Sequence, residues 1–243
     1  MKKILKNLSF MAWLCINLRK LREYEKNIKK ARENGDVVFE RENILKSTVS
    51  WGGDIVKKLN VKLNVTGLEN IPDGPVVFVS NHQSYADIPI YFAAITTKQY
   101  GFVAKDELSK LPFYGSWIRN IRSVFIERGD ARASLRAIEE GIGLLKEGFS
   151  LVIFPEGTRS KGGEMGEFKK GSLRLATKPK VPVVPITLNG TYKIFEEKGY
   201  INSATVDFVI HPPIETKDLS KAEASNLAES VEKIIREKLD ELK

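Results

Sequence analysis

The chain has 243 residues, of which 42% are hydrophobic, and it carries a formal net charge of +8. This length allows one sizeable hydrophobic core, and the positive charge favours an anionic membrane, a phosphorylated substrate or a nucleic acid as partner. The single cysteine, Cys15, excludes a disulfide within the chain. The two distant histidines, His82 and His211, do not form the pattern of a structural zinc site.

Residues 1–63 are strongly basic and follow helical spacing, with a turn expected around Gly35. The apolar stretch at 8–18 is shorter than the ~20 residues that a membrane-spanning helix needs. A basic run at 19–22 follows it, which is typical of an amphipathic helix lying in a membrane interface.

Trp13, Trp51 and the many lysines and arginines of this region are residue types that favour a membrane interface. We therefore predict a basic, amphipathic two-helix hairpin over residues 1–63 that docks on a membrane, followed by a second domain over residues 64–243. The alternative is that these helices simply pack against the main domain.

From about residue 65 the pattern changes to short apolar runs that alternate with helical spacing. The predicted strands are 75–80, 100–104, 123–126, 150–154, 183–188 and 204–210. The predicted helices are 88–95, 132–146 and a final one that begins at a capping box formed by Ser220 and Glu223. This alternation predicts an α/β fold, with a mixed, mostly parallel sheet flanked by helices and preceded by the N-terminal helical hairpin.

The segment N-H-Q-S-Y-A-D, residues 81–87, directly follows the predicted strand 75–80. Sites in α/β proteins gather at the carboxyl ends of strands. If the chain turns between His82 and Asp87, the carboxylate accepts a hydrogen bond from one ring nitrogen, and the other nitrogen can take a proton as a general base. The pair then resembles two members of a Ser-His-Asp triad, with the nucleophile supplied by a substrate hydroxyl. The alternative is a histidine that merely caps the strand end.

A second polar segment, F-P-E-G-T-R-S at residues 154–160, also follows a predicted strand. Its proline and glycine favour a tight, exposed loop. Thr158, Arg159 and Ser160 then present a hydroxyl, a guanidinium and backbone N–H groups together, a combination that suits a phosphate group. The alternative is a solvated loop with an ordinary surface arginine.

Two further charged residues, Lys105 and Arg128, follow predicted strands. If these strands are parallel neighbours, Lys105 and Arg128 converge with His82 and Arg159 at one edge of the sheet. The sequence therefore predicts one site built from several strand ends.

Taken in order, these segments resemble the motifs of the glycerolipid acyltransferase family, specifically the 1-acylglycerol-3-phosphate acyltransferases. The family patterns N-H-x-x-x-x-D (the HX4D motif), F-I-x-R, F-P-E-G-T-R-S and V-P-V-x-P-[VI] match residues 81–87, 125–128, 154–160 and 181–186. The resemblance extends over about residues 65–215. One position departs from it: many members have glycine three residues before the phenylalanine of the second motif, where this chain has Arg122.

The resemblance implies transfer of a fatty acyl group from a thioester of acyl carrier protein or coenzyme A to the sn-2 hydroxyl of lysophosphatidic acid, which makes phosphatidic acid for phospholipid synthesis. It implies no other cofactor and no metal. No covalent acyl-enzyme is expected, because the only cysteine lies in the N-terminal apolar stretch and the sequence has no G-x-S-x-G pattern. Residues 64–243 are then the catalytic domain of a peripheral or monotopic enzyme on the cytoplasmic face of the cell membrane.

The resemblance also assigns roles to particular side chains. These are the general base His82, its orienting carboxylate Asp87, the phosphate-binding residues Arg159, Lys105, Arg128 and Thr158, and the oxyanion and loop residues Glu156 and Gly157. In this assignment the Glu156 side chain braces its loop, and nearby backbone N–H groups stabilise the oxyanion.

Two alternatives stay open. Within the same chemistry, the acceptor is glycerol 3-phosphate or a lysophospholipid with a head group. In a different class, the chain is a non-enzymatic basic domain that binds anionic lipid or nucleic acid. That class accounts for the charge of +8 but not for a histidine and an aspartate placed together after a strand. We expect an enzyme with no nucleic-acid partner.

Overall fold

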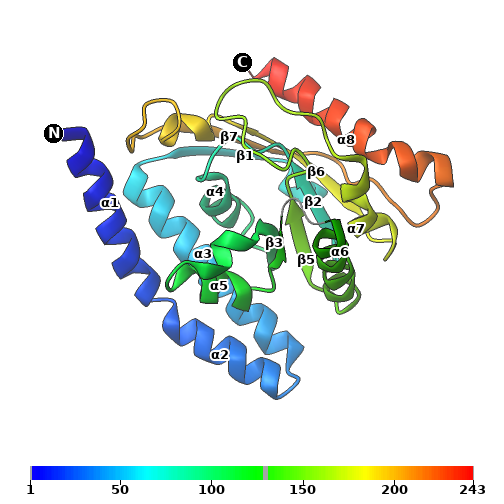
Figure 1. Cartoon of the computed structure of the whole chain (residues 1–243), viewed down its shortest axis with the longest axis horizontal. Helices are drawn as coiled ribbons and strands as arrows, with labels where there is room; N and C mark the ends of the chain where they lie inside the picture. Colours follow the sequence, from blue (N-terminus) through cyan, green and yellow to red (C-terminus); the bar gives the residue numbers. More distant parts are fainter. Residues whose placement is uncertain (1, 128–130, 243) are drawn as a thin grey trace.

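A seven-stranded sheet lies at the centre of the protein, in the order β1-β7-β6-β2-β5-β3-β4 (Figure 1). The structure is a computed structural model that describes residues 2–127 and 131–242. The strands are β1 Lys62–Thr66, β2 Val77–Ser80, β3 Tyr100–Lys105, β4 Val124–Ile126, β5 Ser150–Ile153, β6 Val183–Asn189 and β7 Thr205–Ile210. All neighbouring strands are parallel except β6 and β7, which confirms the predicted mixed, mostly parallel sheet.

The strand directions decide where a site can form. β6, β2, β5, β3 and β4 run the same way, so their carboxyl ends meet at one edge of the sheet. β2 and β5 are hydrogen-bonded neighbours, and Val79 pairs with Ile153 near their carboxyl ends. The two loops that carry the polar motifs therefore start side by side.

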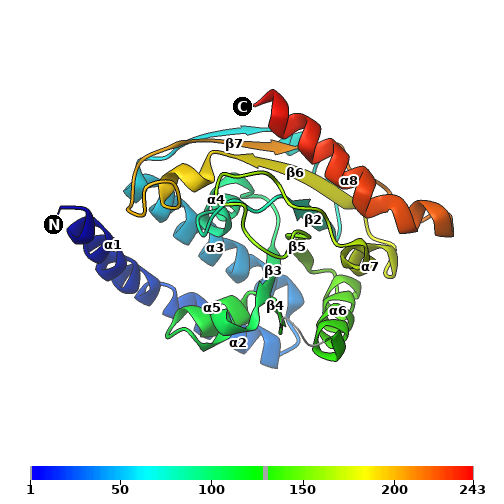
Figure 2. The same cartoon turned by 45° about the horizontal axis from the view of Figure 1, so that its top comes forward.

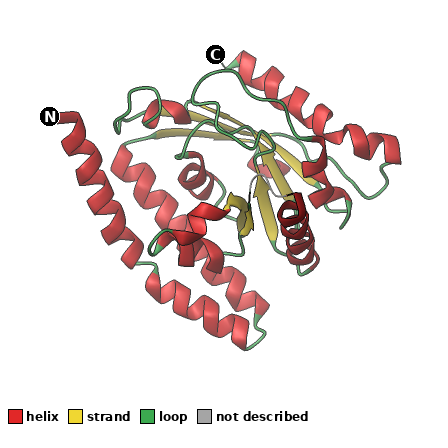
Figure 3. Ribbon diagram, viewed as in Figure 1, coloured by secondary structure: helices red, strands yellow, loops and turns green. Residues whose placement is uncertain are grey.

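Helices cover both faces of this sheet (Figures 1 and 3). The α-helices are α1 Lys2–Arg19, α2 Arg22–Glu33, α3 Val37–Leu59, α4 Asp87–Ala94, α5 Tyr114–Asn120, α6 Ala131–Lys146, α7 Arg174–Thr177 and α8 Lys221–Glu241. Short 3₁₀ helices are η1 Leu68–Asn70, η2 Asp106–Lys110, η3 Lys170–Leu173 and η4 Thr191–Ile194. α3 and α4 lie on one face, and α6, α7 and α8 lie on the other (Figure 2). Because both faces are covered, β2 and β5 are buried along their whole length.

All six predicted strands are present, and the helices predicted at 88–95 and 132–146 correspond to α4 and α6. The capping box of Ser220 and Glu223 forms at the start of α8. β1 is not among the predicted strands. Its residues alternate between exposed and half-buried positions, so no continuous apolar run marks it in the sequence.

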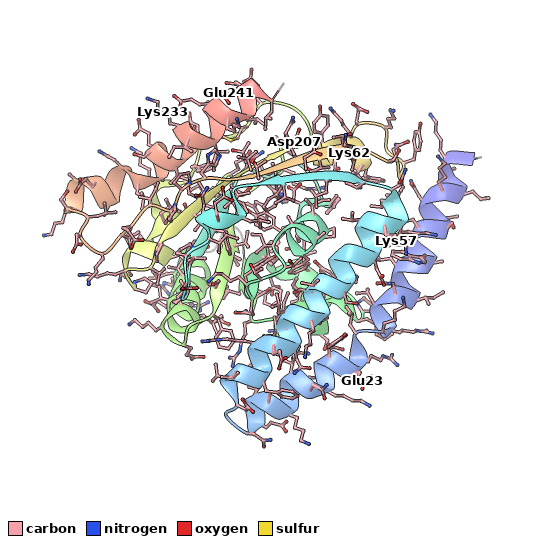
Figure 4. The ribbon with its side chains drawn as sticks, turned by 180° about the vertical axis from the view of Figure 1, so that it is seen from behind. Glu23, Lys57, Lys62, Asp207, Lys233 and Glu241 are labelled. Atoms are coloured by element: carbon pink, nitrogen blue, oxygen red, sulfur yellow. The ribbon has the colours of Figure 1, made fainter. Side chains whose placement is uncertain are left out.

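The N-terminal region contains the predicted hairpin, formed by α2 and α3, with α1 as an additional helix ahead of it. The turn falls at Gly35, whose φ of 71° lies in the left-handed region that favours glycine. α3 packs closely on α4 at Gly52. A Cβ added at this glycine would lie only 2.7 Å from the backbone nitrogen of Ala93, so a larger residue does not fit there. Figure 4 shows α3, which carries Lys57, running across the back of the molecule beside α1.

Trp51 lies in the core and not at the surface. Its side chain is buried, and its ring centroid is 4.8 Å from that of Trp117 and 6.0 Å from that of Phe92. The interpretation of Trp51 as an interfacial residue is therefore wrong, since α3 turns this side chain inward. The helices do pack on the main domain, and the use of residues 1–63 as a membrane-docking unit stays a prediction.

A buried ion-pair cluster fixes the α2–α3 hairpin to the sheet. Glu40 on α3 is 1% exposed, and its carboxylate accepts hydrogen bonds from Arg32 on α2 at 2.6 Å and from Arg122 at 2.7 and 2.8 Å. Arg122 occupies the position where many family members have glycine, and its φ of 66° lies in the left-handed region. The hydrogen bonds to Glu40 offset the strain of placing a side chain there.

Substitution of Glu40 tests this cluster. Glu40→Ala is expected to lower the free energy of unfolding by about 3 kcal/mol, the low end for breaking a buried ion pair, because both arginines are partly exposed. Equilibrium unfolding in urea measures the change. The control is Glu42→Ala, because Glu42 forms an exposed pair with Lys46 on the same helix and its loss is expected to cost less than about 1 kcal/mol. Equal effects of the two substitutions would contradict a stabilising role for the cluster.

Candidate active site

His82 and Asp87 form a hydrogen bond where β2 passes into α4. His82 Nδ1 lies 2.6 Å from Asp87 Oδ2, and the same oxygen accepts from the backbone N–H groups of Gln83 and Ser84 at 2.8 and 3.0 Å. The Asp87 side chain is fully buried. Because a carboxylate accepts, Nδ1 carries the proton and Nε2 is left as the acceptor. The structure brings together the pair that the sequence predicts, in the tautomer that a general base requires.

The second motif holds His82 from the other side. The His82 ring stacks on Phe154 with centroids 4.2 Å apart and an interplanar angle of 16°. The His82 backbone N–H donates to Glu156 Oε1 at 2.6 Å, and its carbonyl accepts from the Ser160 N–H at 2.9 Å. These contacts fix the orientation of the imidazole within the folded chain.

Glu156 braces the loop of the second motif, the role predicted for it from its motif. Its Oε2 accepts from the Gly166 N–H at 2.8 Å, while Oε1 holds the backbone of His82. Burial raises the pKa of Glu156, and the backbone N–H groups of Gly166 and His82 oppose that shift. The Glu156 side chain is 7% exposed and does not line the cavity described next.

A cavity of about 660 Å³ opens beside His82. It is lined by most of the predicted site residues, namely His82, Lys105, Gly157, Thr158 and Arg159. A large part of the remaining wall is apolar and consists of Ile88, Phe102, Val103, Leu108, Ile126, Leu135, Ile138, Ile153 and Phe154. The cavity therefore combines a cationic region with an apolar wall that suits a hydrocarbon chain. Arg128, also predicted for this site, lies outside the described residues.

Two other cationic side chains, Lys169 and Arg174, also line the cavity. Lys169 is expected from the sequence to add positive charge beside the second motif, whereas Arg174 belongs to none of the motifs. Lys169 reaches over the second motif: a Cβ added at Gly157, whose φ is 68°, would lie 2.8 Å from Lys169 Nζ. Lys105 contributes less free charge, because its Nζ pairs with Glu107 at 2.6 Å.

Arg159 is held by two residues that are absent from the predicted site, Tyr85 and Glu196. The Arg159 guanidinium carbon lies 3.4 Å from the centroid of the Tyr85 ring, and Nη1 lies 3.0 Å from Glu196 Oε1. Tyr85 stands inside the first motif, so its position in the sequence could have indicated it. Glu196 belongs to none of the recognised patterns, and only the fold brings it to the site.

This arrangement defines a class of site. The imidazole is oriented by a buried carboxylate, and among the described residues no serine or cysteine side chain forms a hydrogen bond with His82. Such a site suits general-base transfer of a group to a hydroxyl that the substrate supplies.

Comparison with known proteins identifies the family. The family described as Acyltransferase matches residues 62–189, more than half of the chain, and the chain belongs to this family. It is 34% identical over 185 residues to the 1-acyl-sn-glycerol-3-phosphate acyltransferase of Borreliella burgdorferi, with 75% of this chain and 74% of the relative covered. The family that the motifs predict is confirmed.

Two further comparisons agree. The chain is 41% identical over 179 residues to the chloroplastic 1-acyl-sn-glycerol-3-phosphate acyltransferase LPAT1 of Arabidopsis thaliana, with 70% of this chain and 49% of the relative covered. The chain thus spans about half the length of this plant relative. The crystal structure of the 1-acyl-sn-glycerophosphate (LPA) acyltransferase PlsC from Thermotoga maritima shares the fold, with a TM-score of 0.74 and 32% identity over 94% of this chain and 97% of that one.

The raised pKa of Glu156 predicts a pH effect on stability. Between the usual value of 4.5 and the raised value, the native state binds more protons than the unfolded state. The stability that this group contributes is therefore present at low pH and is lost as the pH rises through the raised pKa. Glu156→Gln removes this titration, so the free energy of unfolding of the wild type minus that of the variant is expected to fall from about pH 4 to about pH 7.

Urea unfolding at several pH values measures this difference. Glu164→Gln is the matched control, because Glu164 lies in the same long loop and is exposed. For Glu164→Gln, the difference from wild type in the free energy of unfolding is expected to stay constant over the same pH range. A difference for Glu156→Gln that stays flat or rises with pH would show that burial does not dominate the ionisation of Glu156.

Proposed function

We propose that this protein transfers a fatty acyl group from an acyl thioester to the sn-2 hydroxyl of lysophosphatidic acid and so makes phosphatidic acid. The observation that carries this proposal is the His82–Asp87 hydrogen bond beside a cavity that Arg159 also lines. The names of the relatives, 1-acyl-sn-glycerol-3-phosphate acyltransferases, support the same acceptor.

In the proposed reaction His82 Nε2 takes the proton of the acceptor hydroxyl, and the resulting alkoxide attacks the thioester carbonyl carbon. The tetrahedral intermediate collapses with cleavage of the C–S bond. The leaving thiolate takes the proton from the imidazolium, which restores the neutral histidine. Asp87 holds the ring and stabilises its charged form. Because the acceptor alkoxide attacks the thioester directly, no acyl group is attached to the protein.

The resemblance assigns the oxyanion contact to backbone N–H groups near Glu156 and Gly157. The Gly157 N–H donates to the Phe154 carbonyl at 3.0 Å and is therefore already used in the turn. In the described part of the chain the N–H groups of Thr158 and Arg159 have no such partner, and both residues line the cavity, so we assign the oxyanion contact to them.

The acceptor phosphate is assigned to Arg159, with the Thr158 hydroxyl beside it. An arginine can bind a terminal phosphate through two parallel hydrogen bonds, which favours lysophosphatidic acid over a lysophospholipid with a head group. The apolar wall of the cavity favours an acceptor with a long acyl chain over glycerol 3-phosphate. Competition between these acceptors in one assay separates the three cases.

The donor is proposed to be a thioester of acyl carrier protein or coenzyme A, with no further cofactor and no metal. Each delivers the same acyl carbonyl to His82, so the proposed chemistry does not distinguish them.

Substitution of the pair tests the mechanism. His82→Ala is expected to lower kcat at least about 100-fold, because a general base typically contributes 10²–10⁴-fold. Asp87→Asn is expected to cause a similar loss, since the amide no longer fixes the histidine tautomer. Transfer of radiolabelled acyl groups onto lysophosphatidic acid in vesicles measures both rates.

The control for this assay is His211→Gln. His211 lies at the end of β7, where its Nε2 is 2.8 Å from Thr187 Oγ1, and it does not line the cavity. Near-normal activity is expected for it, and circular dichroism confirms that each variant is folded. A folded His82→Ala protein with near-normal rates would refute the mechanism. A wild-type protein that is inactive with every donor and lysophospholipid would favour the non-enzymatic lipid-binding domain.

We further propose that α1 lies in the membrane interface on the cytoplasmic face of the cell membrane. Ile4, Leu8 and Met11 are spaced by four and three residues, so they share one face of the helix, and each is more than half exposed. Lys3 and Lys6 on the same helix are exposed as well. Exposed apolar and basic side chains on one helix suit an anionic membrane surface.

None of the described helices is long and apolar enough to cross a membrane.

Substitutions on α1 test this docking. The triple variant Ile4→Gln, Leu8→Gln and Met11→Gln is expected to lower binding to anionic vesicles at least about tenfold. Full burial of one such side chain contributes about 1.5–3 kcal/mol, and about 1.4 kcal/mol already corresponds to a tenfold change in affinity. Activity on a short-chain acceptor dissolved as monomers is expected to stay near normal. Sedimentation with vesicles measures the binding.

The matched control is Leu68→Gln, an exposed apolar residue on η1. Unchanged vesicle binding by the triple variant would exclude α1 as the docking element. Deletion of residues 1–60 is a poorer test, because Ile44 and Ile55 of α3 belong to the core and their removal would expose it.

A further inference from the structure

One buried carboxylate, Glu196, connects the two motif loops. Glu196 lies just after η4, far along the chain from both motifs, and its side chain is 4% exposed. Oε2 accepts from the Ser84 hydroxyl at 2.6 Å, and Oε1 accepts from the Tyr85 backbone N–H at 2.9 Å. Glu196 thereby holds the middle of the loop that joins His82 to Asp87.

The same carboxylate also holds Arg159. Arg159 Nη1 donates to Glu196 Oε1 at 3.0 Å, and the guanidinium lies over the Tyr85 ring at 3.4 Å. The arginine is therefore fixed along one edge by Glu196 and on one face by Tyr85. Its side chain is still 21% exposed, and it lines the cavity beside His82.

The contacts of Glu196 and Tyr85 with Arg159 lower the entropy that this side chain loses when it binds a phosphate. A free arginine side chain loses about 2 kcal/mol of conformational entropy when it is immobilised. Two parallel hydrogen bonds to a phosphate also require the plane of the guanidinium to be correctly oriented. An arginine that is already oriented in the free protein loses less entropy when phosphate binds.

We propose that Glu196 is a positioning residue that orients Arg159 for the acceptor phosphate and sets its place relative to His82. This inference rests on the proposed function and deepens it. Glu196 contacts both the loop that carries the base and the arginine assigned to the phosphate. It thus fixes how far the phosphate lies from Nε2, and therefore whether the sn-2 hydroxyl of the acceptor reaches the base.

The test is Glu196→Gln in the full chain. Glutamine has the same shape, and its Oε1 can still accept from the Tyr85 N–H, so the His82 loop is expected to be preserved. The same oxygen can still accept from Arg159, but the amide carries no charge, so the ion pair is lost and the hydrogen bond that holds the guanidinium is weaker. The KM for lysophosphatidic acid is expected to rise about tenfold, while kcat falls no more than about threefold.

The matched control is Glu197→Gln. Glu197 is the next residue, its side chain is 43% exposed, and it pairs only loosely with Lys198 at 3.8 Å. KM and kcat are expected to stay within about twofold of wild type. A second variant, Tyr85→Leu, removes the ring under the guanidinium at an exposed position and is expected to raise KM in the same direction.

A double-mutant cycle separates positioning from a general structural role. If Glu196 acts through Arg159, the Glu196→Gln change is expected to have no further effect in an Arg159→Ala background. Affinity for inorganic phosphate, measured by calorimetry on the full chain, supplies the same comparison without turnover. Glu196→Gln is expected to weaken phosphate binding about tenfold and Glu197→Gln to leave it unchanged.

The outcomes distinguish this inference from the proposed function. A wild-type protein that makes no phosphatidic acid overturns the proposed function, and the phosphate titration then decides the role of Glu196 alone. An active wild type with an unchanged or lower KM and an unchanged or tighter phosphate affinity in Glu196→Gln overturns the inference. Additive effects of Glu196→Gln and Arg159→Ala overturn it as well.

Discussion

The parallel pairing of β2 with β5 is the constraint on which the site depends. Because the two strands are neighbours that run the same way, the first motif and the second motif leave the sheet at the same edge. His82 can then stack on Phe154 and receive a hydrogen bond at its carbonyl from Ser160. Neither motif orients the imidazole alone, since Asp87 fixes the ring nitrogen and the second loop fixes the backbone.

Buried carboxylates connect segments that lie far apart in the chain. An ionised carboxylate without partners is very unfavourable in a protein interior, so each one selects the conformations that supply it with donors. Glu156 joins the His82 backbone to the loop at Gly166, and Glu40 joins two helices to the turn before β4. Asp87 does the same locally, over one turn. The fold is therefore specified at the sheet edge by polar contacts as well as by the apolar core.

These contacts also explain what the sequence can predict. Buried strands such as β2 and β5 are continuous apolar runs, and the pair His82 and Asp87 is close in sequence, so both were predictable. β1 lacks an apolar run, and Trp51 is of a residue type that suits a core as well as an interface. Glu196 is more than 30 residues from Arg159, and no local pattern records a contact that only the sheet order creates.

In the proposed function, the pairing of Arg159 with Glu196 affects how the cavity attracts the acceptor phosphate. The charge of Arg159 is largely balanced by a buried carboxylate 3.0 Å away, and Lys105 is balanced by Glu107. Lys169 and Arg174 line the same cavity and form no ion pair in the described part of the chain. Among the described residues, the proposed attraction over longer range is assigned to these two side chains, and the direction at contact to Arg159. In the proposed function, such a division of roles would let a polar head group enter from an anionic membrane and still be held in one orientation beside His82.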